Sequence, residues 1–252
     1  MARRADGWHD IDSVLVPIDW HDLVGVSLTF ADTNSVSLSV TGPVAGGVPT
    51  GDGNLTVRAA KALATIAGRP LEIRLWLSKS VPHGAGLGGG SADAAAVLRT
   101  GAGLLNAVGI ATDPAAVAEA ALSIGSDIPA LLAQGAQRVR GRGDLLEPLR
   151  TPSLDITVVS TVPSSTAATY AAVRPEEIGD DERSSRLARS LNAGLAPDDA
   201  LMGSALERAA CRADPQLAIA IRRVRDVRPD VAWHLTGSGG AVFAPGATRA
   251  DA

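Results

Sequence analysis

The stretch from Pro82 to Ala92 carries the strongest chemical signal in the sequence. It reads Pro-His-Gly-Ala-Gly-Leu-Gly-Gly-Gly-Ser-Ala, with five glycines in seven positions, and a helix is expected to begin at Ser91. Glycine lets a backbone approach a ligand closely, and a helix start presents unpaired N–H groups with a partial positive charge. The stretch therefore predicts an anion site suited to the phosphates of a nucleotide.

Two common nucleotide-binding motifs are excluded for this loop. No Gly-Lys-Ser/Thr follows it, as a Walker A loop requires. No acidic residue stands at the end of a next strand about 20 residues on, as a Rossmann loop requires. A glycine-rich turn without a ligand stays the alternative, although a plain turn rarely needs so many glycines.

Asp127 is the candidate catalytic side chain, within Gly-Ser-Asp-Ile-Pro at 125–129. A carboxylate in reach of a substrate hydroxyl can take its proton during a transfer reaction. Aspartate before a proline-containing helix start is also a common N-cap. Both roles are open from the residues alone.

Composition narrows the class of protein. The 252 residues are 46% hydrophobic and carry a formal net charge of -4, which argues against a nucleic acid or an anionic membrane as partner. Cys211 is the only cysteine, so an internal disulfide or a thiolate metal cluster is excluded. No apolar run reaches the ~18 residues that span a bilayer, and the charged residues 1–12 do not resemble a secretory signal. We expect a cytoplasmic protein.

Apolar periodicity predicts an α+β protein. Alternation indicates strands at 23–30, 35–40 and 71–77, while Asn54 and Gly68 are typical start and stop residues for a helix over 55–67. Further helices are expected at 91–105, 112–125, 127–132, 167–173, 183–194, 201–212 and 215–227, and further strands at 12–18, 137–140, 154–159, 231–235 and 241–243. The arginines at 138, 140 and 142 are expected on one solvated strand face, with a phosphate clamp as the alternative. The pattern restarts near residue 150, which predicts two domains, 1–150 and 151–252.

The glycine-rich loop resembles the second motif of the GHMP kinases, Pro-x-x-x-Gly-Leu-Gly-Gly-Gly-Ser-Ala-Asp-Ala-Ala. The resemblance implies that the loop binds the triphosphate of ATP, with Ser91 in reach of Mg²⁺. The residues so assigned are Pro82, His83, Gly84, Ala85, Gly86, Leu87, Gly88, Gly89, Gly90, Ser91 and Ala92. No residue is assigned as a metal ligand.

Two further segments resemble motifs of the same superfamily. Thr-Gly-Ser-Gly-Gly-Ala-Val-Phe at 236–243 is similar to the third motif, which implies that Gly237, Ser238 and Gly239 lie beside the ATP loop and the substrate phosphates. The segment around Asp127 is similar to Gly-(Ser/Ala)-Asp-Val-Pro, whose aspartate is the base that accepts the substrate proton.

The N-terminal segment Arg-Ala-Asp-Gly-Trp-His resembles the Arg-x-Asp-Gly-Tyr-His motif of one GHMP branch, the kinases of 4-diphosphocytidyl-2-C-methyl-D-erythritol. The resemblance implies that Trp8 stacks on the cytosine and that His9 bonds its polar edge. Pro-Ser-Ser-Thr-Ala-Ala-Thr-Tyr at 163–170 resembles a second segment of this branch, which implies that Thr166 binds the substrate and that Tyr170 closes over the cytosine.

These resemblances imply a two-domain GHMP kinase with a ribosomal-S5-like N-terminal domain, a ferredoxin-like C-terminal domain and the active site between them. The implied reaction transfers a phosphoryl group from ATP, with Mg²⁺, to the 2-hydroxyl of 4-diphosphocytidyl-2-C-methyl-D-erythritol in non-mevalonate isoprenoid synthesis. We expect a monomer or homodimer. The alternatives are a GHMP kinase for another small alcohol, such as homoserine or mevalonate, and a weak or inactive nucleotide-binding relative.

The sequence departs from the family pattern at both ends. Family members carry an upstream Pro-x-Lys-x-Asn-Leu strand, whose lysine pairs with the catalytic aspartate and the transferred phosphoryl group. Lys61 and Lys79 are the only lysines here, and neither is expected to replace it. Family chains also continue beyond the third motif. We therefore expect a fragment of a longer kinase, with a true short form as the alternative.

Overall fold

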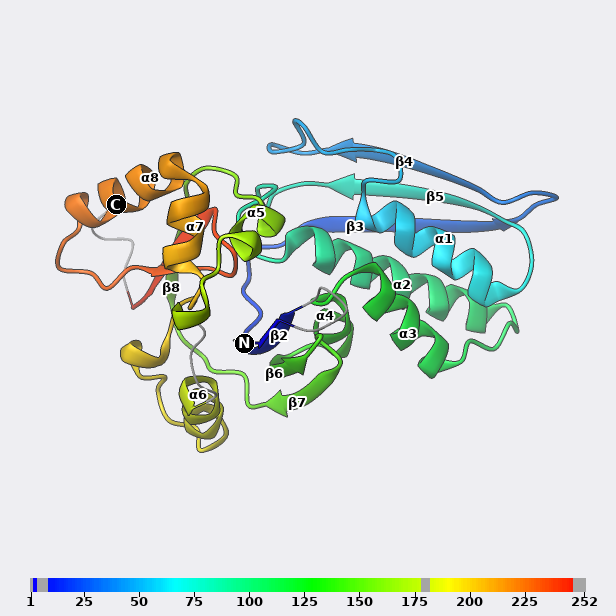
Figure 1. Cartoon of the computed structure of the whole chain (residues 1–252). Coiled ribbons are helices and arrows are strands. Elements are labelled where there is room, and N and C mark those ends of the chain that lie inside the picture. The colour runs from blue at the N-terminus through cyan, green and yellow to red at the C-terminus, as the bar shows by residue number, and fades with distance from the viewer. Residues whose placement is uncertain (1, 4–8, 178–181, 247–252) are drawn as a thin grey trace.

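The computed structural model describes residues 2–3, 9–177 and 182–246 (Figure 1). The strands are β1 Ala2–Arg3, β2 His9–Leu15, β3 Leu23–Phe30, β4 Ser35–Thr41, β5 Leu71–Ser78, β6 Ala136–Gly141, β7 Leu145–Leu149, β8 Ile156–Ser160, β9 His234–Leu235 and β10 Ala241–Pro245. The α-helices are α1 Leu55–Ala67, α2 Gly89–Ala107, α3 Pro114–Ile124, α4 Ile128–Ala133, α5 Thr166–Ala171, α6 Glu182–Asn192, α7 Glu207–Ala213 and α8 Pro215–Val227. Short 3₁₀ turns lie at Pro175–Glu177 and Asp199–Leu201.

The largest core lies between the sheet β3-β5-β4 and helices α1 to α4 (Figure 1). The central strand β5 pairs antiparallel with β3 and parallel with β4. Its residues Leu71, Ile73, Leu75 and Leu77 are buried on one side, as the alternation predicted, while Trp76 on the other side is 51% exposed. This packing holds the end of β5 and the start of α2 in place, and the glycine-rich loop joins them.

The helix α1 forms where local signals predicted it. The Asn54 side chain accepts from the Thr56 N–H at 2.9 Å, and Gly68 ends the helix in the left-handed region at φ 64°. The apolar face of α1 packs against α2 through residues such as Leu63, which is fully buried.

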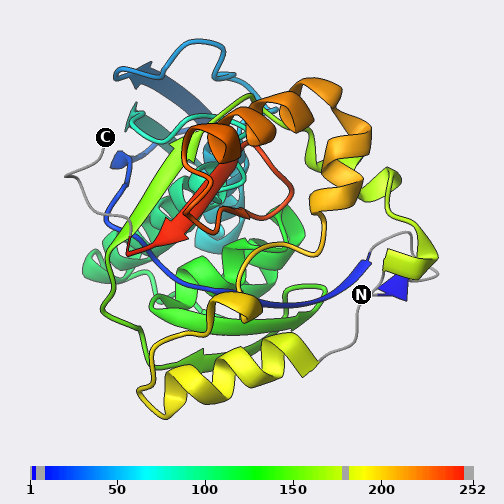
Figure 2. The same cartoon turned by 90° about the vertical axis from the view of Figure 1, so that its left-hand side faces the viewer.

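A second sheet has the strand order β1-β2-β6-β7, and Figure 2 shows α6 running alongside it. Leu187, Ala188 and Leu191 of α6 pack against the sheet. The strand β7 was not predicted from the sequence, because Pro148 interrupts it. As β7 lies at the sheet edge, the missing N–H of proline removes no bond to a further strand.

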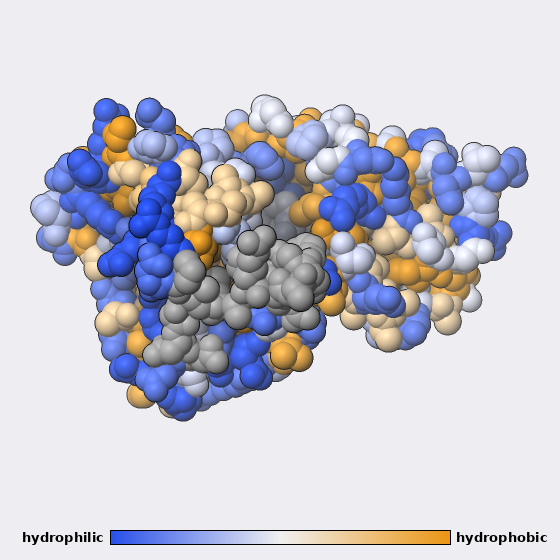
Figure 3. All heavy atoms as spheres, viewed as in Figure 1, coloured by the Kyte–Doolittle hydropathy of each residue, from blue (hydrophilic) through white to orange (hydrophobic). Residues whose placement is uncertain are grey.

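The C-terminal part of the chain builds a third sheet, β8-β10-β9, at the end of the molecule away from α1 and α3 (Figure 1). Helices α7 and α8 cover it, with Leu217, Ile221 and Trp233 in the core. On the face drawn in Figure 3, hydrophilic and hydrophobic residues are intermixed, and the surface is hollowed between this part and the part that carries α1 to α3. The α+β class is as predicted.

Several element boundaries differ from those predicted, among them those of β2, which covers His9–Leu15 rather than 12–18. The helix α2 begins at Gly89 rather than Ser91, because the packing of this helix outweighs the low helix propensity of glycine. The helix α7 begins at Glu207 rather than near Leu201, because Gly203 takes a positive φ of 83° that a helix cannot contain. The strand β9 covers only His234–Leu235.

Within the described ranges, no helix combines the length and apolarity needed to span a membrane.

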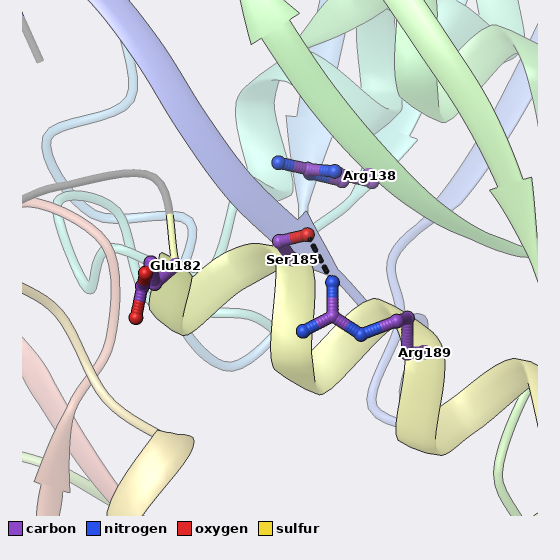
Figure 4. Close-up of a pocket in the computed structure, with 4 residues that line it drawn as sticks. All are labelled: Arg138, Glu182, Ser185 and Arg189. Atoms are coloured by element: carbon purple, nitrogen blue, oxygen red, sulfur yellow. Dashed lines mark hydrogen bonds between the residues drawn. The ribbon is translucent and has the colours of Figure 1, made fainter.

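A cavity of about 290 Å³ lies between α6 and β6, lined by Arg138, Glu182, Ser185 and Arg189 (Figure 4). The Arg138 guanidinium binds the Asp12 carboxylate through two bonds of 3.0 and 2.7 Å. Its side chain is only 13% exposed, so the predicted solvated face is wrong at this arginine. The alternation that predicted this face could not show that α6 would cover it.

Candidate active site

The glycine-rich loop ends at the first turn of α2. Gly88 precedes this helix in the left-handed region at φ 71°, and the first turn holds no acidic side chain. Gly90 is exposed, and a Cβ added there would meet no atom within 4 Å. The first backbone N–H groups of a helix have no partner within it, so this helix start offers donors and a partial positive charge to an anion.

The other loop residues differ in exposure. Ala85 is buried, Pro82, Leu87 and Ser91 are partly buried, and His83 and Ala92 are exposed. Their assignment to the triphosphate stays a prediction.

The turn after β9 packs directly against the loop. Thr236 Oγ1 donates to the Ala85 carbonyl at 2.9 Å. A Cβ on Gly86 would overlap a carbonyl of the turn, and a Cβ on Gly240 would overlap the carbonyl of Gly84. Gly86 and Gly240 are therefore required because two backbones pack against each other there. From the sequence alone, the loop glycines were predicted only to let the backbone bind phosphate.

Hydroxyl groups join α5 to the same turn. Thr166 Oγ1 and Ser238 Oγ lie 2.8 Å apart, and Thr169 Oγ1 donates to the Ser238 carbonyl at 3.0 Å. Gly237 and Gly239 flank this serine at φ 44° and 114°. The structure thus brings together four of the five residues that were predicted to bind substrate from these two segments, namely Thr166, Gly237, Ser238 and Gly239.

Asp127 occupies the N-cap position of α4, but its side chain caps no N–H group of the helix. The residue is exposed to solvent, and yet desolvation by the surrounding protein raises the pKa of its carboxyl group. The carboxyl group is thus accessible to solvent and yet surrounded by enough protein to be partly desolvated. The turn between β6 and β7 supports this segment, because a Cβ on Gly143 would overlap the carbonyl of Ser126.

The start of α4 lies next to the glycine-rich loop. Helix α4 packs against α2, and Leu131 Cδ1 lies 3.9 Å from the Cβ position of Gly88. The candidate base and the candidate phosphate site therefore occupy neighbouring helix starts.

Tyr170 of α5 lies within electrostatic reach of Asp127. Burial, and secondarily the negative charge of Asp127, raise the pKa of the Tyr170 hydroxyl to about 12. Asp127 and Tyr170 are 43 positions apart in the sequence (170 − 127). The fold has therefore brought Tyr170, which was predicted to bind cytosine, close to the candidate base.

The other predicted cytosine contacts are not tested. Trp8 lies outside the described residues. His9 begins β2 and pairs with Arg3 of β1 through its backbone, while its side chain lies outside the description. Their roles stay predictions.

Comparison with known proteins identifies the family of this chain. The model of the GHMP kinases N terminal domain matches residues 54–135, which include α1, the loop and Asp127. A 4-diphosphocytidyl-2-C-methyl-D-erythritol kinase of Pelotomaculum thermopropionicum is 33% identical over 96% of this chain and 83% of its own length. The chain belongs to this family of GHMP kinases.

Other family members match over a shorter span. The kinase of the same name from Paramagnetospirillum magneticum is 38% identical over 68% of this chain and 58% of its own length. The match thus spans less than two thirds of that relative.

Solved structures support the same family. A crystal structure of 4-(cytidine 5'-diphospho)-2C-methyl-D-erythritol kinase is 31% identical, covers 96% of this chain and 83% of its own, and has a TM-score of 0.70. A homoserine kinase from Cytophaga hutchinsonii, 17% identical over 90% of this chain and 77% of its own with a TM-score of 0.60, shares the fold. The predicted GHMP kinase fold is confirmed.

The sequence interpretation missed one charged cluster of this GHMP kinase. Lys79 forms ion pairs with Asp22 and with Asp93, and all three side chains are buried. A signal was present in the sequence. Asp93 lies in the Ala-rich start of α2 and Lys79 follows an apolar strand, and charged residues in apolar segments are often buried with a partner. As predicted, neither lysine pairs with the candidate base, since Lys61 binds Asp52 on the surface at 2.6 Å.

Proposed function

We propose that this chain transfers the γ-phosphoryl group of ATP to the 2-hydroxyl of 4-diphosphocytidyl-2-C-methyl-D-erythritol, a step of non-mevalonate isoprenoid synthesis. Relatives of that name at 33% and 38% identity support the substrate. The site supports the reaction class, because it combines a candidate base with a helix start that can bind phosphate.

One observation carries the proposal. Asp127 stands at a helix N-cap with its carboxylate unused by that helix, accessible, and desolvated enough to raise its pKa. A raised pKa makes a carboxylate a stronger base, and a position next to a phosphate site suits it to an attacking hydroxyl. A purely structural N-cap would instead be hydrogen-bonded to the helix.

Each part of the site has a distinct task in the proposed reaction. The N–H groups at the start of α2 bind the triphosphate, and Asp127 accepts the proton of the 2-hydroxyl. Positioning and charge stabilisation supply most of the rate in phosphoryl transfer. Trp8, His9 and Tyr170 hold the cytosine, while Thr166 and the turn 237–239 bind the substrate near its phosphates.

Mg²⁺ is proposed as the companion of ATP. Among the described residues, no group of three His, Cys, Asp or Glu side chains could hold a metal ion. Mg²⁺ commonly enters kinase sites through substrate phosphates with only one or two protein ligands, so the residues fit an ion that arrives with the nucleotide. The domain boundary near residue 150, the cytoplasmic location and the monomer or homodimer state stay predictions.

A coupled ADP-release assay with ATP, Mg²⁺ and the diphosphocytidyl substrate tests this function. We expect turnover by the wild-type chain, loss of turnover in Asp127→Asn, and retention in Asp113→Asn. Asp113 is a matched control because it caps α3 through a bond of 2.9 Å to the Ala115 N–H, which asparagine can replace. Turnover that survives Asp127→Asn contradicts the assigned base.

A binding measurement separates the substrate from the chemistry. Titration with CDP tests the cytosine site without phosphoryl transfer. A folded wild-type chain that binds ATP but not CDP contradicts the choice of substrate. A chain that binds both without turnover supports the nucleotide-binding alternative.

A further inference from the structure

A buried ionic cluster lies beneath both ends of the glycine-rich loop. Lys79 follows β5, Asp22 precedes β3, and Asp93 stands in the first turns of α2. Their side chains are 4%, 2% and 5% exposed, respectively. The Lys79 ammonium bonds directly to Asp22 and lies 2.9 Å from Asp93 Oδ2.

Asp22 holds the backbone on the entry side of the loop. Its Oδ1 accepts from the N–H groups of Ser80 at 2.6 Å and Val81 at 2.9 Å. The Trp20 indole N–H donates to the Ser80 carbonyl at 3.1 Å. Ser80 and Val81 are therefore held by side chains. Lys79, before them, is held by its backbone, because its N–H donates to the Thr41 carbonyl at 2.7 Å in continuation of the β4–β5 pairing.

The exit side of the loop rests on the same cluster. Gly89, the first residue of α2, packs so closely that an added Cβ would lie 3.1 Å from Val81 Cγ1 and 3.5 Å from Asp22 Oδ2. One turn further, Asp93 contributes its carboxylate to Lys79. The strand end and the helix start are thus tied to one ammonium group, and the loop 82–88 spans between them.

Burial excludes a direct role of this lysine in binding an exposed ligand. Its ammonium group has two carboxylate partners and almost no solvent contact. We infer that Asp22, Lys79 and Asp93 are positioning residues, which hold the glycine-rich loop and the start of α2 in the conformation that binds nucleotide phosphate. This inference rests on the proposed function for the role of the loop in binding ATP.

The electrostatics of the cluster rank its members. Two carboxylates share one ammonium, so loss of Lys79 leaves two buried negative groups facing each other. Desolvation raises the pKa of Asp93 to about 6, against the opposing effect of Lys79. For Asp22, the hydrogen bonds from Lys79 and the two backbone N–H groups outweigh desolvation, and its pKa is lowered. Asp22 bonds to Lys79 and also to two backbone N–H groups next to the loop, whereas Asp93 bonds to Lys79, so Asp22 is the more important partner.

Substitutions test the ranking against a matched control. We expect Lys79→Met to weaken ATP binding at least about tenfold by titration calorimetry, a change worth 1.4 kcal/mol, with a larger effect on the KM for ATP than on kcat. Asp22→Asn, which preserves shape and one acceptor, is expected to weaken binding less, and Asp93→Asn least. Lys61→Met removes the exposed pair with Asp52 and is expected to change nothing.

Hydrogen exchange of the ATP-free chain separates positioning from general stability. We expect Lys79→Met and Asp22→Asn to speed exchange at residues 80–92 while α1 and β5 keep their protection. Should Lys79→Met fail to fold, Asp22→Asn carries the same test. Unchanged exchange at 80–92 overturns the inference, as does faster exchange spread evenly over the core.

The outcome is separable from that of the proposed function. A wild-type chain that binds no ATP contradicts the assignment of the loop to ATP, whereas the exchange experiment without nucleotide still tests whether the cluster positions the loop. ATP affinity within twofold of wild type in both folded variants overturns the inference even where the kinase activity is confirmed.

Discussion

Among the described α-helices, α3, α4 and α8 each begin with an aspartate close to a proline, and they use that aspartate differently. Asp113 and Asp214 adopt extended backbone conformations and accept hydrogen bonds from the first N–H groups of α3 and α8. Asp127, before α4, has a helical backbone conformation at φ -83° and ψ -19°, and its carboxylate caps nothing. Similar local sequences thus place two carboxylates in structural roles and leave the third available for chemistry.

The difference has a tertiary cause. The segment before α4 is held against the turn between β6 and β7, where Gly143 abuts the backbone of Ser126. This contact accompanies the helical conformation at Asp127, in which its side chain does not reach back to the helix N–H groups. A carboxylate that caps no N–H group adds no local hydrogen bond to its helix, which is typical of residues kept for function.

The largest expected effect is on the rate of phosphoryl transfer. Asp127→Asn removes the proposed proton acceptor and is expected to lower kcat by about 10²- to 10⁴-fold, the usual contribution of a general base. In Asp214→Asn the asparagine side chain can still cap α8, so this variant is expected to retain the wild-type rate. Steady-state kinetics of both variants under saturating ATP measure the contrast, and equal rates in the two variants would remove the functional difference between the helix starts.

The pH dependence of kcat/KM should follow the raised pKa of Asp127. A general base works only when deprotonated, so with Asp127 as the proposed base activity should fall as the pH drops through its pKa, by about tenfold per pH unit below it. Because desolvation raises this pKa, the acid limb is expected above the ordinary value of 3.8. Desolvation also raises the pKa of Asp93, to about 6. Asp93→Asn is therefore expected to keep the fall of kcat/KM at acid pH. If this fall disappears in Asp93→Asn, it reports the titration of the buried cluster rather than that of Asp127.

A smaller effect is expected at the capping aspartates. Asp214→Ala removes the bonds to the Gln216 and Leu217 N–H groups, at 2.9 and 3.3 Å. It should lower the free energy of unfolding by about 1 kcal/mol, as is usual for a lost N-cap. Urea unfolding measures this value. A loss below about 0.3 kcal/mol would show that the capping bonds contribute little, which would weaken the comparison with α4.

The smallest effect, of opposite sign, concerns the stability of Asp127→Asn. A carboxyl whose pKa is raised by folding binds more protons in the folded state, so its ionised form lowers stability once the pH exceeds the unfolded value. Asp127→Asn should therefore be as stable as the wild type or more stable at pH 7, and this gain should vanish at a pH below the unfolded value. Unfolding at the two pH values tests the sign, and a clear loss at pH 7 would indicate a hidden structural role.

Local sequence signals determined much of this protein. The cap at Asn54 and the stop at Gly68 predicted α1, because both act through backbone groups of their immediate neighbours. The alternation in β5 predicted its buried face for the same reason. The motif segments indicated the GHMP kinases, which the family comparisons confirmed. Where tertiary contacts compete with local preference, as at the start of α2 and at Pro148 in β7, the sequence was misleading or silent.

Only the tertiary structure decided which groups meet. The ammonium of Lys79 and the carboxylate of Asp22 come from positions 57 residues apart, and neither position has a local pattern that names its partner. The same holds for Gly86 and Gly240, whose lack of side chains serves the contact between two distant backbones as well as any ligand. Local signals act through hydrogen bonds and sterics within a few residues, whereas a site requires charges and backbones that only the packing of helices and sheets brings within bonding distance.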